Sequence, residues 1–531
     1  MDIVETQYRR RPSLLSLVLL TVAGLGLYLG FLSTSYDPNG VIEAEAVERD
    51  GAALFSPNHI LYRPLVRLVG TSLGAAGYED RSIVFAQITA AVFGALGMGL
   101  FYWWLRPLIN HEVVAVLVTL GFGTSWAYWV FSTDAYYIVL AATCIIGMFI
   151  LLAVIWTTPQ LQPSPGLLVG AGILCALSIL FWQADIFIVP VVWIGLLVTY
   201  RASIRRLLVG ALLFSMPIAI VVGGVYVYVG AFILGHSSTN SFLDWFLHYG
   251  ARLSMWGRWD ITRLFELVKS ALASLVPLWE GLGLRALLRG EFHADKIIIQ
   301  IALVALALLL LLPLLGKLRR RPLISKTHML GWLLLVYLIY LPFITWWDPF
   351  EPKWFVIPNI GLWTILALLW DSMVIRPRQA VILGGLIVSI ATANFSATVW
   401  PRHSTPNINL VKAKCVAEHL AAEDLLVSAE WGEWAQYVSY FFHRQVFSII
   451  DASARYSGTE EVFNRMQQEI AAVQQRGGRI YTVEFATFFS PEALSWLTSQ
   501  TGLTQEDFQR FEGTPAFVCD GTRFQEISLV R

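Results

Sequence analysis

Long apolar runs between residues 13 and 397 constrain this chain more than any other feature of its sequence. A helix that crosses a bilayer needs about 20 mainly apolar residues, and runs of that length recur about eleven times. Hydrophobic residues make up 56% of the 531 positions and charged residues 14%, whereas soluble proteins carry roughly 25% charged residues. The sequence therefore predicts an all-α polytopic membrane domain over residues 1–400. Its spans are expected near 13–33, 82–105, 112–131, 135–156, 166–182, 186–200, 207–233, 297–315, 329–347, 355–370 and 379–397.

Lys and Arg residues in the short loops orient the chain, because they favour the cytoplasmic side of a membrane. Arg9, Arg10 and Arg11 precede the first run and place the N-terminus in the cytoplasm. The opposite short loops contain a single cation, Lys353. We therefore expect an integral protein of the plasma (inner) membrane whose C-terminal domain is extracytoplasmic. Alternation of the spans places these further cations inside: Arg201, Arg205, Arg206, Lys317, Arg319, Arg320, Arg321, Lys326, Arg376 and Arg378.

The run from Glu112 to Trp156 is too long for a single span, and it carries Asp134 near its middle. An Asp at the centre of a membrane helix costs about 2.5–3.5 kcal/mol on insertion scales. A break at Ser132–Asp134 removes this cost and leaves two spans of ordinary length. Asp134 then lies at the outer interface, where it can take part in chemistry, cap the following helix, or do both.

The first outer loop, within 34–81, concentrates acidic residues on a body that is otherwise apolar. Carboxylates are costly inside a bilayer but can act at its surface. We therefore expect chemistry in this loop. Between Tyr36 and Leu68 five carboxylates, those of Asp37, Glu43, Glu45, Glu48 and Asp50, precede the basic residues His59 and Arg63.

The other outer loops supply candidate phosphate-binding cations. Loop 234–296 carries Arg252 and Arg258, whose guanidinium groups match phosphate oxygens geometrically, although pairing with membrane headgroups is the more ordinary role. The second half of this loop has apolar residues at helical spacing, which predicts one or two helices along the membrane surface. Lys353 lies in a tight turn, where it either contacts a phosphate or faces solvent.

After Trp400 the spanning runs cease and charged residues become frequent, which predicts a soluble domain over 401–531. Short β-like runs alternate there with helical patterns, and this order predicts an α/β domain with a mostly parallel sheet. The aromatic stretch 429–443 fits core packing, docking on the membrane domain or glycan binding. A disulfide between Cys415 and Cys519 stays open. The β-like runs are 425–429, 446–450 and 480–484, and the helical patterns are 409–423, 459–476 and 490–499.

The order of these features resembles the GT-C superfamily of polytopic glycosyltransferases, which includes protein O-mannosyltransferases and lipid A aminoarabinose transferases (family 39-like). The resemblance rests on a cytoplasmic N-terminus, on Asp37 in STSYDPNG after the first span, and on Asp134 in FSTDAYYIVL at the start of the fourth span. The segment SPNHILYRPL, with His59 and Arg63, matches the second loop helix of the family loosely, because an HPP sequence is absent. The similarity covers residues 1–400, and the tail is like the α/β domain that some members carry.

The resemblance implies transfer of a sugar from a polyprenyl-phosphate-linked donor to an extracytoplasmic lipid, glycan or protein acceptor, with inversion at the anomeric carbon. It implies Asp37 as the general base, a role that contributes typically about 10²–10⁴-fold to rate, and Asp134 as its orienting partner. A divalent cation held by Asp37 and Asp134 is a further expectation, and Glu43 and Glu45 are alternative catalytic carboxylates. The expected donor-binding residues are His59, Arg63, Arg252, Arg258 and Lys353.

Two other function classes stay open. A transporter or flippase is expected to carry ionisable residues or broken helices near the middle of the membrane, whereas the charges here cluster at the outer face. A non-catalytic membrane assembly protein would use the tail for binding and would leave the acidic loop without a role. The formal net charge of zero gives no support to a nucleic-acid partner, which usually requires a basic patch. Membrane lipids are the remaining expected partners.

Overall fold

The computed structural model describes residues 12–49, 51–157, 164–247, 259–277, 297–318, 327–373, 377–429, 434–455, 459–483, 498, 502–508 and 511–530. By its packing the chain forms two compact units. The membrane unit comprises Met1–Ser33, Arg49–Gly235 and Trp259–Ser404, and the tail unit comprises Thr34–Glu48, His236–Arg258 and Thr405–Arg531. The acidic stretch 34–48 thus packs within the tail unit, whereas the predicted limits of 1–400 and 401–531 kept it with the membrane domain.

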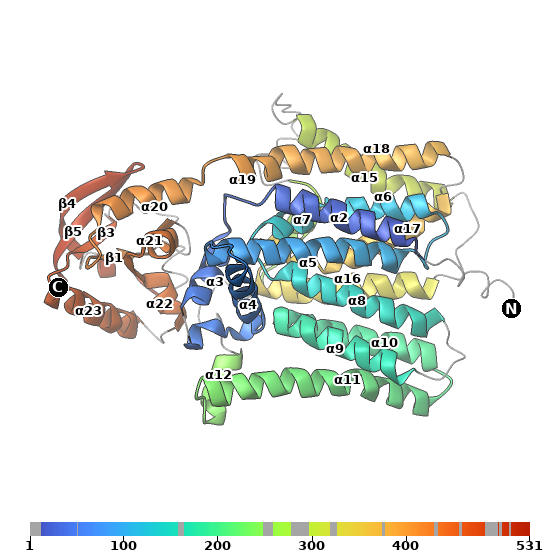
Figure 1. The fold of residues 1–531 in the computed structure, drawn as a ribbon, viewed down its shortest axis with the longest axis horizontal. Coiled ribbons are helices and arrows are strands. Elements are labelled where there is room, and N and C mark those ends of the chain that lie inside the picture. Colours follow the sequence, from blue (N-terminus) through green and yellow to red (C-terminus); the bar gives the residue numbers. More distant parts are fainter. Residues whose placement is uncertain are drawn as a thin grey trace. The chain divides into compact units, whose positions relative to one another are not determined.

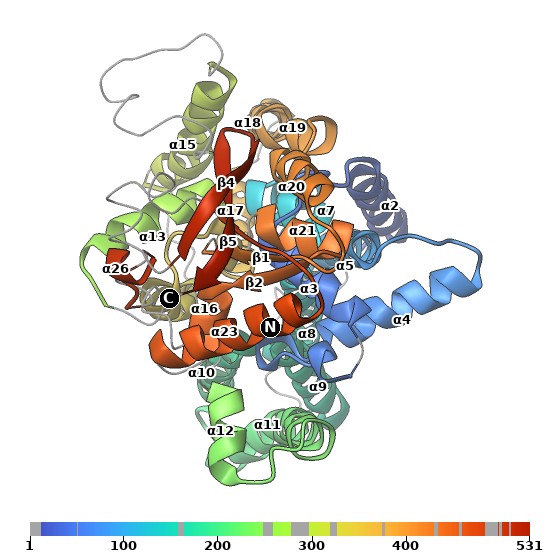
Figure 2. The same cartoon turned by 90° about the vertical axis from the view of Figure 1, so that its left-hand side faces the viewer.

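Most long helices of the membrane unit, such as α5, α8 and α11, run roughly along a common direction, whereas α4 lies across it (Figures 1 and 2). A helix lies within each apolar run that the sequence predicts as a span, which satisfies backbone groups inside a bilayer. The helices are α2 (Leu14–Gly30), α4 (Tyr62–Ala75), α5 (Ser82–Leu105), α6 (Glu112–Gly123), α7 (Trp126–Thr133), α8 (Ile138–Thr157), α9 (Pro165–Phe181), α10 (Ile188–Tyr200), α11 (Ile204–Val227), α13 (Thr262–Ala273), α15 (Ile297–Leu318), α16 (Thr327–Trp347), α17 (Pro358–Met373), α18 (Pro377–Asn394) and α19 (Trp400–Ser404).

Short helices join these elements. The 3-10 helices are η1 (Gly51–Leu54), η2 (Pro57–His59), η3 (Gln183–Phe187) and η7 (Pro352–Phe355), and two π-helical turns, η4 (Tyr228–Ile233) and η8 (Phe395–Val399), extend α11 and α18. Helix α13 lies within loop 234–296, where the sequence predicts a helix along the membrane surface. It buries Leu267 while Phe265 and Val268 are exposed, so apolar side chains lie on both of its faces.

Within the described residues, six helices are long and apolar enough to cross a membrane, or up to seven when α6 and α7 count together as one bent span. Shorter apolar helices occur at Leu14–Gly30, Pro165–Phe181 and Ile298–Leu314. The chain is thus a polytopic membrane protein, as predicted. The expected total of about eleven spans stays a prediction.

The long run 112–156 breaks between α7 and α8, as predicted, and bends by 60° between α6 and α7. The bend has a local cause in hydrogen bonding. The first backbone amides of α7, those of Trp126 and Ala127, donate to the carbonyl oxygens of Leu275 and Ser274, which follow α13. These carbonyls satisfy amides that have no acceptor within their own helix. The sequence predicts the break from its Asp but not the bend, because the acceptors come from a distant segment.

The tail unit contains a five-stranded sheet with the order β2-β1-β3-β5-β4 (Figure 2). Strands β1, β2 and β3 pair in parallel, as predicted, whereas β5 is antiparallel to both β3 and β4. The sheet is therefore mixed and not mostly parallel. The prediction lacks the β4–β5 hairpin, although its turn residues Asp520 and Gly521 form the Asp-Gly pair typical of hairpins. The strands are β1 (Leu425–Ser428), β2 (Gln445–Ser448), β3 (Ile480–Val483), β4 (Phe511–Cys519) and β5 (Thr522–Val530).

Helices pack on both faces of this sheet. Side chains of α22 and α23, including Ile450 and Met466, form a core with Val427 and Ile527. Alternation along β5 places Phe524 on the face opposite Ile527, and there the Trp434 ring of α21 meets Phe524 at 5.5 Å. The tail helices are α3 (Pro38–Glu48), α12 (Thr239–Leu247), α20 (Ile408–His419), α21 (Trp434–Phe442), α22 (Ile449–Arg455), α23 (Thr459–Gln475) and α26 (Gln505–Phe508).

One predicted strand of the tail is shorter in the structure, and one predicted helix lies almost wholly outside the described residues. The expected strand 446–450 ends early, because Ile449 and Ile450 begin α22 and are buried against α23. The expected helix 490–499 lies outside the described residues, apart from position 498.

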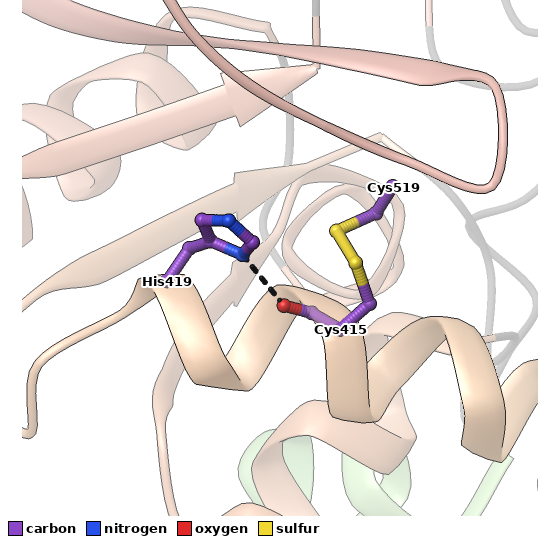
Figure 3. The surroundings of a disulfide bond; sticks show 3 residues. All are labelled: Cys415, His419 and Cys519. Atoms are coloured by element: carbon purple, nitrogen blue, oxygen red, sulfur yellow. Dashed lines mark hydrogen bonds between the residues drawn. A yellow bond between two sulfur atoms is a disulfide. The ribbon is translucent and has the colours of Figure 1, made fainter.

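A disulfide joins Cys415 on α20 to Cys519 at the end of β4 (Figure 3). The sequence leaves this pairing open, because spacing alone does not give connectivity. The His419 ring lies one turn further along α20 and stacks on Phe517 at 4.4 Å. The ligand atoms of Cys415, His419 and Cys519 lie within 4.8 Å of one another. Because the two sulfur atoms are bonded to each other, they are not metal ligands in this state.

Candidate functional site

The chain passes from α7 to α8 through residues Thr133–Tyr137, which we call the Asp134 turn. Asp134 is fully buried, and its Oδ2 lies 2.5 Å from Nη2 of Arg402 on α19. Its Oδ1 accepts a hydrogen bond of 2.8 Å from the backbone amide of Ala135. A buried carboxylate is stable only when it is paired and hydrogen-bonded. The Arg402 guanidinium, whose side chain is 27% exposed, supplies that countercharge.

Backbone contacts fix the Asp134 turn from two further segments of the membrane unit. The backbone amide of Ser33 donates to the carbonyl of Thr133 at 3.0 Å. The Gln87 side-chain amide of α5 donates to the carbonyls of both Ser33 and Thr133, at 2.7 and 3.3 Å. His403, next to Arg402, lies 2.9 Å from the carbonyl oxygen of Leu32. The segment after α2, helix α5 and helix α19 therefore all hold the Asp134 turn.

A row of stacked rings leads from the Asp134 turn to two predicted donor-binding residues. The His59 ring stacks on Tyr137 at 4.3 Å, and Tyr137 stacks on Tyr136 at 4.5 Å. The ammonium of Lys353 lies 5.2 Å from the centre of the Tyr136 ring. Such faces attract cations through the ring quadrupole. His59 and Lys353, which come from η2 and η7, are thus brought to the turn that carries Asp134.

The remaining predicted cations have different positions. Arg63 is buried in α4, and its Nη1 donates to the carbonyl of Ala53 in η1 at 2.5 Å. This bond ties α4 to the chain that precedes it. Arg252 and Arg258 lie outside the described residues, so their donor-binding role stays a prediction.

The other predicted carboxylates belong to α3 in the tail unit. Asp37 precedes the helix, and its Oδ1 accepts from the backbone amide of Asn39 at 2.8 Å. Glu45 is buried and accepts from Ser439 Oγ at 2.6 Å and from the Gln436 amide of α21. Glu43 is buried as well. Contacts of Glu45 hold α3 to α21, so this carboxylate has a structural partner in the aromatic stretch 429–443.

The countercharge at Asp134 bears on the predicted divalent cation. A metal ion at Asp134 would compete with the Arg402 guanidinium, which already balances the carboxylate. The residues around Asp134 therefore fit an arginine better than a metal. Metal binding at Asp37 stays a prediction.

Sequence reasoning missed Arg402, Tyr136 and Tyr137. Tyr136 and Tyr137 follow Asp134 after a single alanine, so their proximity to the site could have been predicted from the sequence. Arg402 is separated from Asp134 by 268 positions. Its only signal is its place just after the last apolar run, at the outer end of the predicted final span.

Comparison with other proteins gives a likeness of structure but not of sequence. No protein-family model matches the chain, and no curated protein matches it. Among solved structures, ArnT from Cupriavidus metallidurans bound to undecaprenyl phosphate matches with a TM-score of 0.57 and 12% identity, covering 96% of this chain and 97% of ArnT. ArnT in the apo state matches over the same shares with 12% identity and a TM-score of 0.43.

A third structure is the oligosaccharyltransferase of Archaeoglobus fulgidus in complex with Zn and sulfate, with 10% identity, a TM-score of 0.48, and coverage of 96% of this chain and 73% of the other. The fold assignment rests on the lipid-bound ArnT structure, which has the highest TM-score of the three and is matched over nearly its full length. At such low identity the likeness is one of fold. The chain therefore shares the fold of the lipid-bound ArnT structure, and the resemblance of its sequence to GT-C proteins is confirmed at the level of fold.

Proposed function

We propose that this chain transfers a sugar from a polyprenyl-phosphate-linked donor to an acceptor on the extracytoplasmic side of the membrane. The observation that carries the proposal is the Asp134 turn, where a buried carboxylate, the Arg402 guanidinium and the Lys353 ammonium surround one bend of the chain. The fold supports it, because ArnT was solved with undecaprenyl phosphate bound. The Cys415–Cys519 disulfide supports an extracytoplasmic tail, since disulfides persist in oxidising compartments.

The chemistry needs a base and a binding site for an anionic leaving group. An acceptor hydroxyl or amine attacks the anomeric carbon, its proton passes to a base, and the bond from that carbon to the phosphate oxygen breaks. The phosphate gains a second negative charge as it leaves. Fixed cations that meet this developing charge stabilise the transition state more than the ground state. We assign this task to Lys353 and Arg402, with Arg63, Arg252 and Arg258 as further candidates and His59 as a donor contact.

The base is assigned to Asp37, with inversion at the anomeric carbon. Asp134 then acts indirectly by holding Arg402. Asp37 directly precedes α3, and its Oδ1 accepts a hydrogen bond from the Asn39 backbone amide. Glu43 and Glu45 are the alternatives, and the hydrogen bonds from Ser439 and Gln436 make Glu45 the weaker of the two.

Substitution of Asp37 by Asn tests the assignment. We expect Asp37→Asn to lower the transfer rate by about 10²–10⁴-fold, because a general base typically contributes that much. Binding of short-chain polyprenyl phosphate should be unchanged, since the phosphate contacts cations. Transfer is measured with purified protein in detergent and a radiolabelled polyprenyl-phosphate sugar, and binding by isothermal calorimetry.

Asp80→Asn is the matched control, because Asp80 is an exposed carboxylate of the same outer loop. It should leave transfer at the wild-type rate. Full transfer by Asp37→Asn would remove the base assignment and direct attention to Glu43. Wild-type protein that neither binds polyprenyl phosphate nor consumes its sugar conjugate would overturn the proposed function as a whole.

A further inference from the structure

A second buried carboxylate of the membrane unit lies outside the Asp134 turn. Asp185, on η3 between α9 and α10, is fully buried. Its Oδ1 accepts from the Tyr340 hydroxyl of α16 at 2.9 Å, and its Oδ2 accepts from Ser178 Oγ of α9. Among the described residues, no Lys or Arg forms an ion pair with it. Asp185 therefore differs from Asp134, because neutral hydroxyl groups and not a guanidinium satisfy its oxygens.

A stack of three parallel rings begins at the residue that Asp185 binds. The Tyr340 ring lies 5.9 Å from Trp182 with a 10° angle between their planes. Trp182 lies 5.5 Å from Trp354 with an angle of 9°. The backbone amide of Asp185 also donates to the Trp182 carbonyl at 2.9 Å, so Asp185 bonds to Tyr340 through its side chain and to Trp182 through its backbone. Offset and parallel aromatic pairs of this kind resist sliding because they are closely packed.

Lys353 ends this stack. Its ammonium lies 5.1 Å from the Trp354 ring and 5.2 Å from the Tyr136 ring, so two aromatic faces hold one cation. The side chain is 5% exposed, and Glu351, which is 44% exposed, approaches to 3.5 Å. Lysine is otherwise a flexible side chain that loses much rotamer freedom when it binds a ligand. The rings meet that entropy cost before any ligand arrives.

We propose that Asp185 is a positioning residue for Lys353, acting through Tyr340, Trp182 and Trp354 so that the ammonium is held ready for the phosphate group of the lipid-linked donor. The inference rests on the proposed function, which makes Lys353 a phosphate contact. It adds a residue that touches neither substrate nor Lys353 itself. It also explains why a carboxylate is retained within a buried part of the membrane unit, where its cost must be balanced by a role or by its hydrogen bonds.

Binding measurements on four variants test this role. We expect Lys353→Met to weaken binding of short-chain polyprenyl phosphate about 10–100-fold, because a hydrogen bond to a charged group is lost. Asp185→Ala and Tyr340→Phe should weaken it about 3–10-fold, since the ammonium is still present but is held less well. Asp185→Asn should bind close to wild type, because its amide oxygen can accept the Tyr340 bond and its nitrogen can bond Ser178.

Two comparisons separate positioning from a general structural role. The uncharged polyprenol of the same chain length should bind all variants equally, because it has no phosphate for Lys353 to contact. In a Lys353→Met background, Asp185→Ala should cause no further loss, since the cation that it positions is gone. Trp182→Leu should behave like Asp185→Ala, whereas Trp193→Leu, a half-exposed tryptophan of the neighbouring α10, should behave like wild type.

The outcomes are distinguishable. An additive loss from Asp185→Ala in the Lys353→Met background, or an equal loss of polyprenol binding, would overturn the positioning role. Sensitivity to Lys353→Met without sensitivity to Asp185→Ala would overturn it too, while leaving the proposed function in place. Failure of wild-type protein to bind any polyprenyl phosphate would count against the proposed function itself.

Discussion

The Asp134 turn of the membrane unit and the contact between α3 and α21 in the tail unit both bury a carboxylate, but the two sites balance its charge differently. In the membrane unit Asp134 meets the Arg402 guanidinium. In the tail unit Glu45 meets the hydroxyl of Ser439 and the amide of Gln436. Loss of a neutral donor removes one hydrogen bond of several, whereas loss of a guanidinium leaves a buried charge without its partner. The comparison teaches that single substitutions should damage the Asp134 turn more than the contact between α3 and α21.

The largest loss of folding stability is expected from Arg402→Met. This change keeps an unbranched apolar side chain and removes the guanidinium with its charge, so it should destabilise the protein by about 3–5 kcal/mol, the usual cost of breaking a buried pair from one side. The unfolding temperature in detergent, followed by circular dichroism, measures the loss.

Two further variants show whether that loss arises from charge. Adding Asp134→Asn to Arg402→Met should recover much of the stability, because no buried charge is then left. Arg465→Met is the surface control, since its pair with Glu469 is 46% and 41% exposed and should be worth less than about 1 kcal/mol. Equal losses from Arg402→Met and Arg465→Met would contradict the contrast between buried and exposed pairs.

A smaller loss of stability is expected when the disulfide is removed. Among the described cysteines, only Cys415 and Cys519 of the tail unit form one. Replacing Cys415 and Cys519 by Ala should cost about 2–5 kcal/mol, the range for native disulfides. Reductant should have the same effect on the wild-type protein and none on the double variant, because Cys144 and Cys175 are free and buried in the membrane unit. Limited proteolysis with and without reductant measures this. Faster cleavage in the membrane unit, with the tail unaffected, would be the contrary result.

The sequence could predict those charged residues of the candidate site whose burial in a membrane would be costly. Asp134 stood out because a charge at the middle of a long apolar run is costly, and the break around it is present in the structure. Lys353 stood out as the lone cation of the short loops opposite the cytoplasmic ones. Asp37 was expected from the acidic loop and the family resemblance, and its role stays a prediction. The parallel strands β1, β2 and β3 could be predicted because short apolar runs alternate there with helical patterns.

The remainder depends on distant contacts that no local pattern records. The pair of Asp134 and Arg402 joins positions separated by 268 residues, and the rings of Trp182, Trp354 and Tyr340 come from separate segments. The acidic α3 looked like part of a membrane-surface loop, because nothing in its composition shows that Glu45 bonds to α21. The β4–β5 hairpin is a different case, since its Asp-Gly turn was a local signal that could have been used.

The smallest loss of folding stability is expected from Ser439→Ala, which removes one neutral hydrogen-bond donor to Glu45. The cost should be about 1 kcal/mol, the net value of a typical hydrogen bond, and Ser453→Ala, whose hydroxyl bonds within its own helix α22, should cost less. Transfer by folded Ser439→Ala protein should stay at the wild-type rate, because Glu45 then serves only to hold α3. If Ser439→Ala instead changed the rate or its pH dependence without changing stability, Glu45 would be a reacting group. Glu45 would then take part in the reaction, and the contrast between the Asp134 turn and the contact of α3 with α21 would no longer hold.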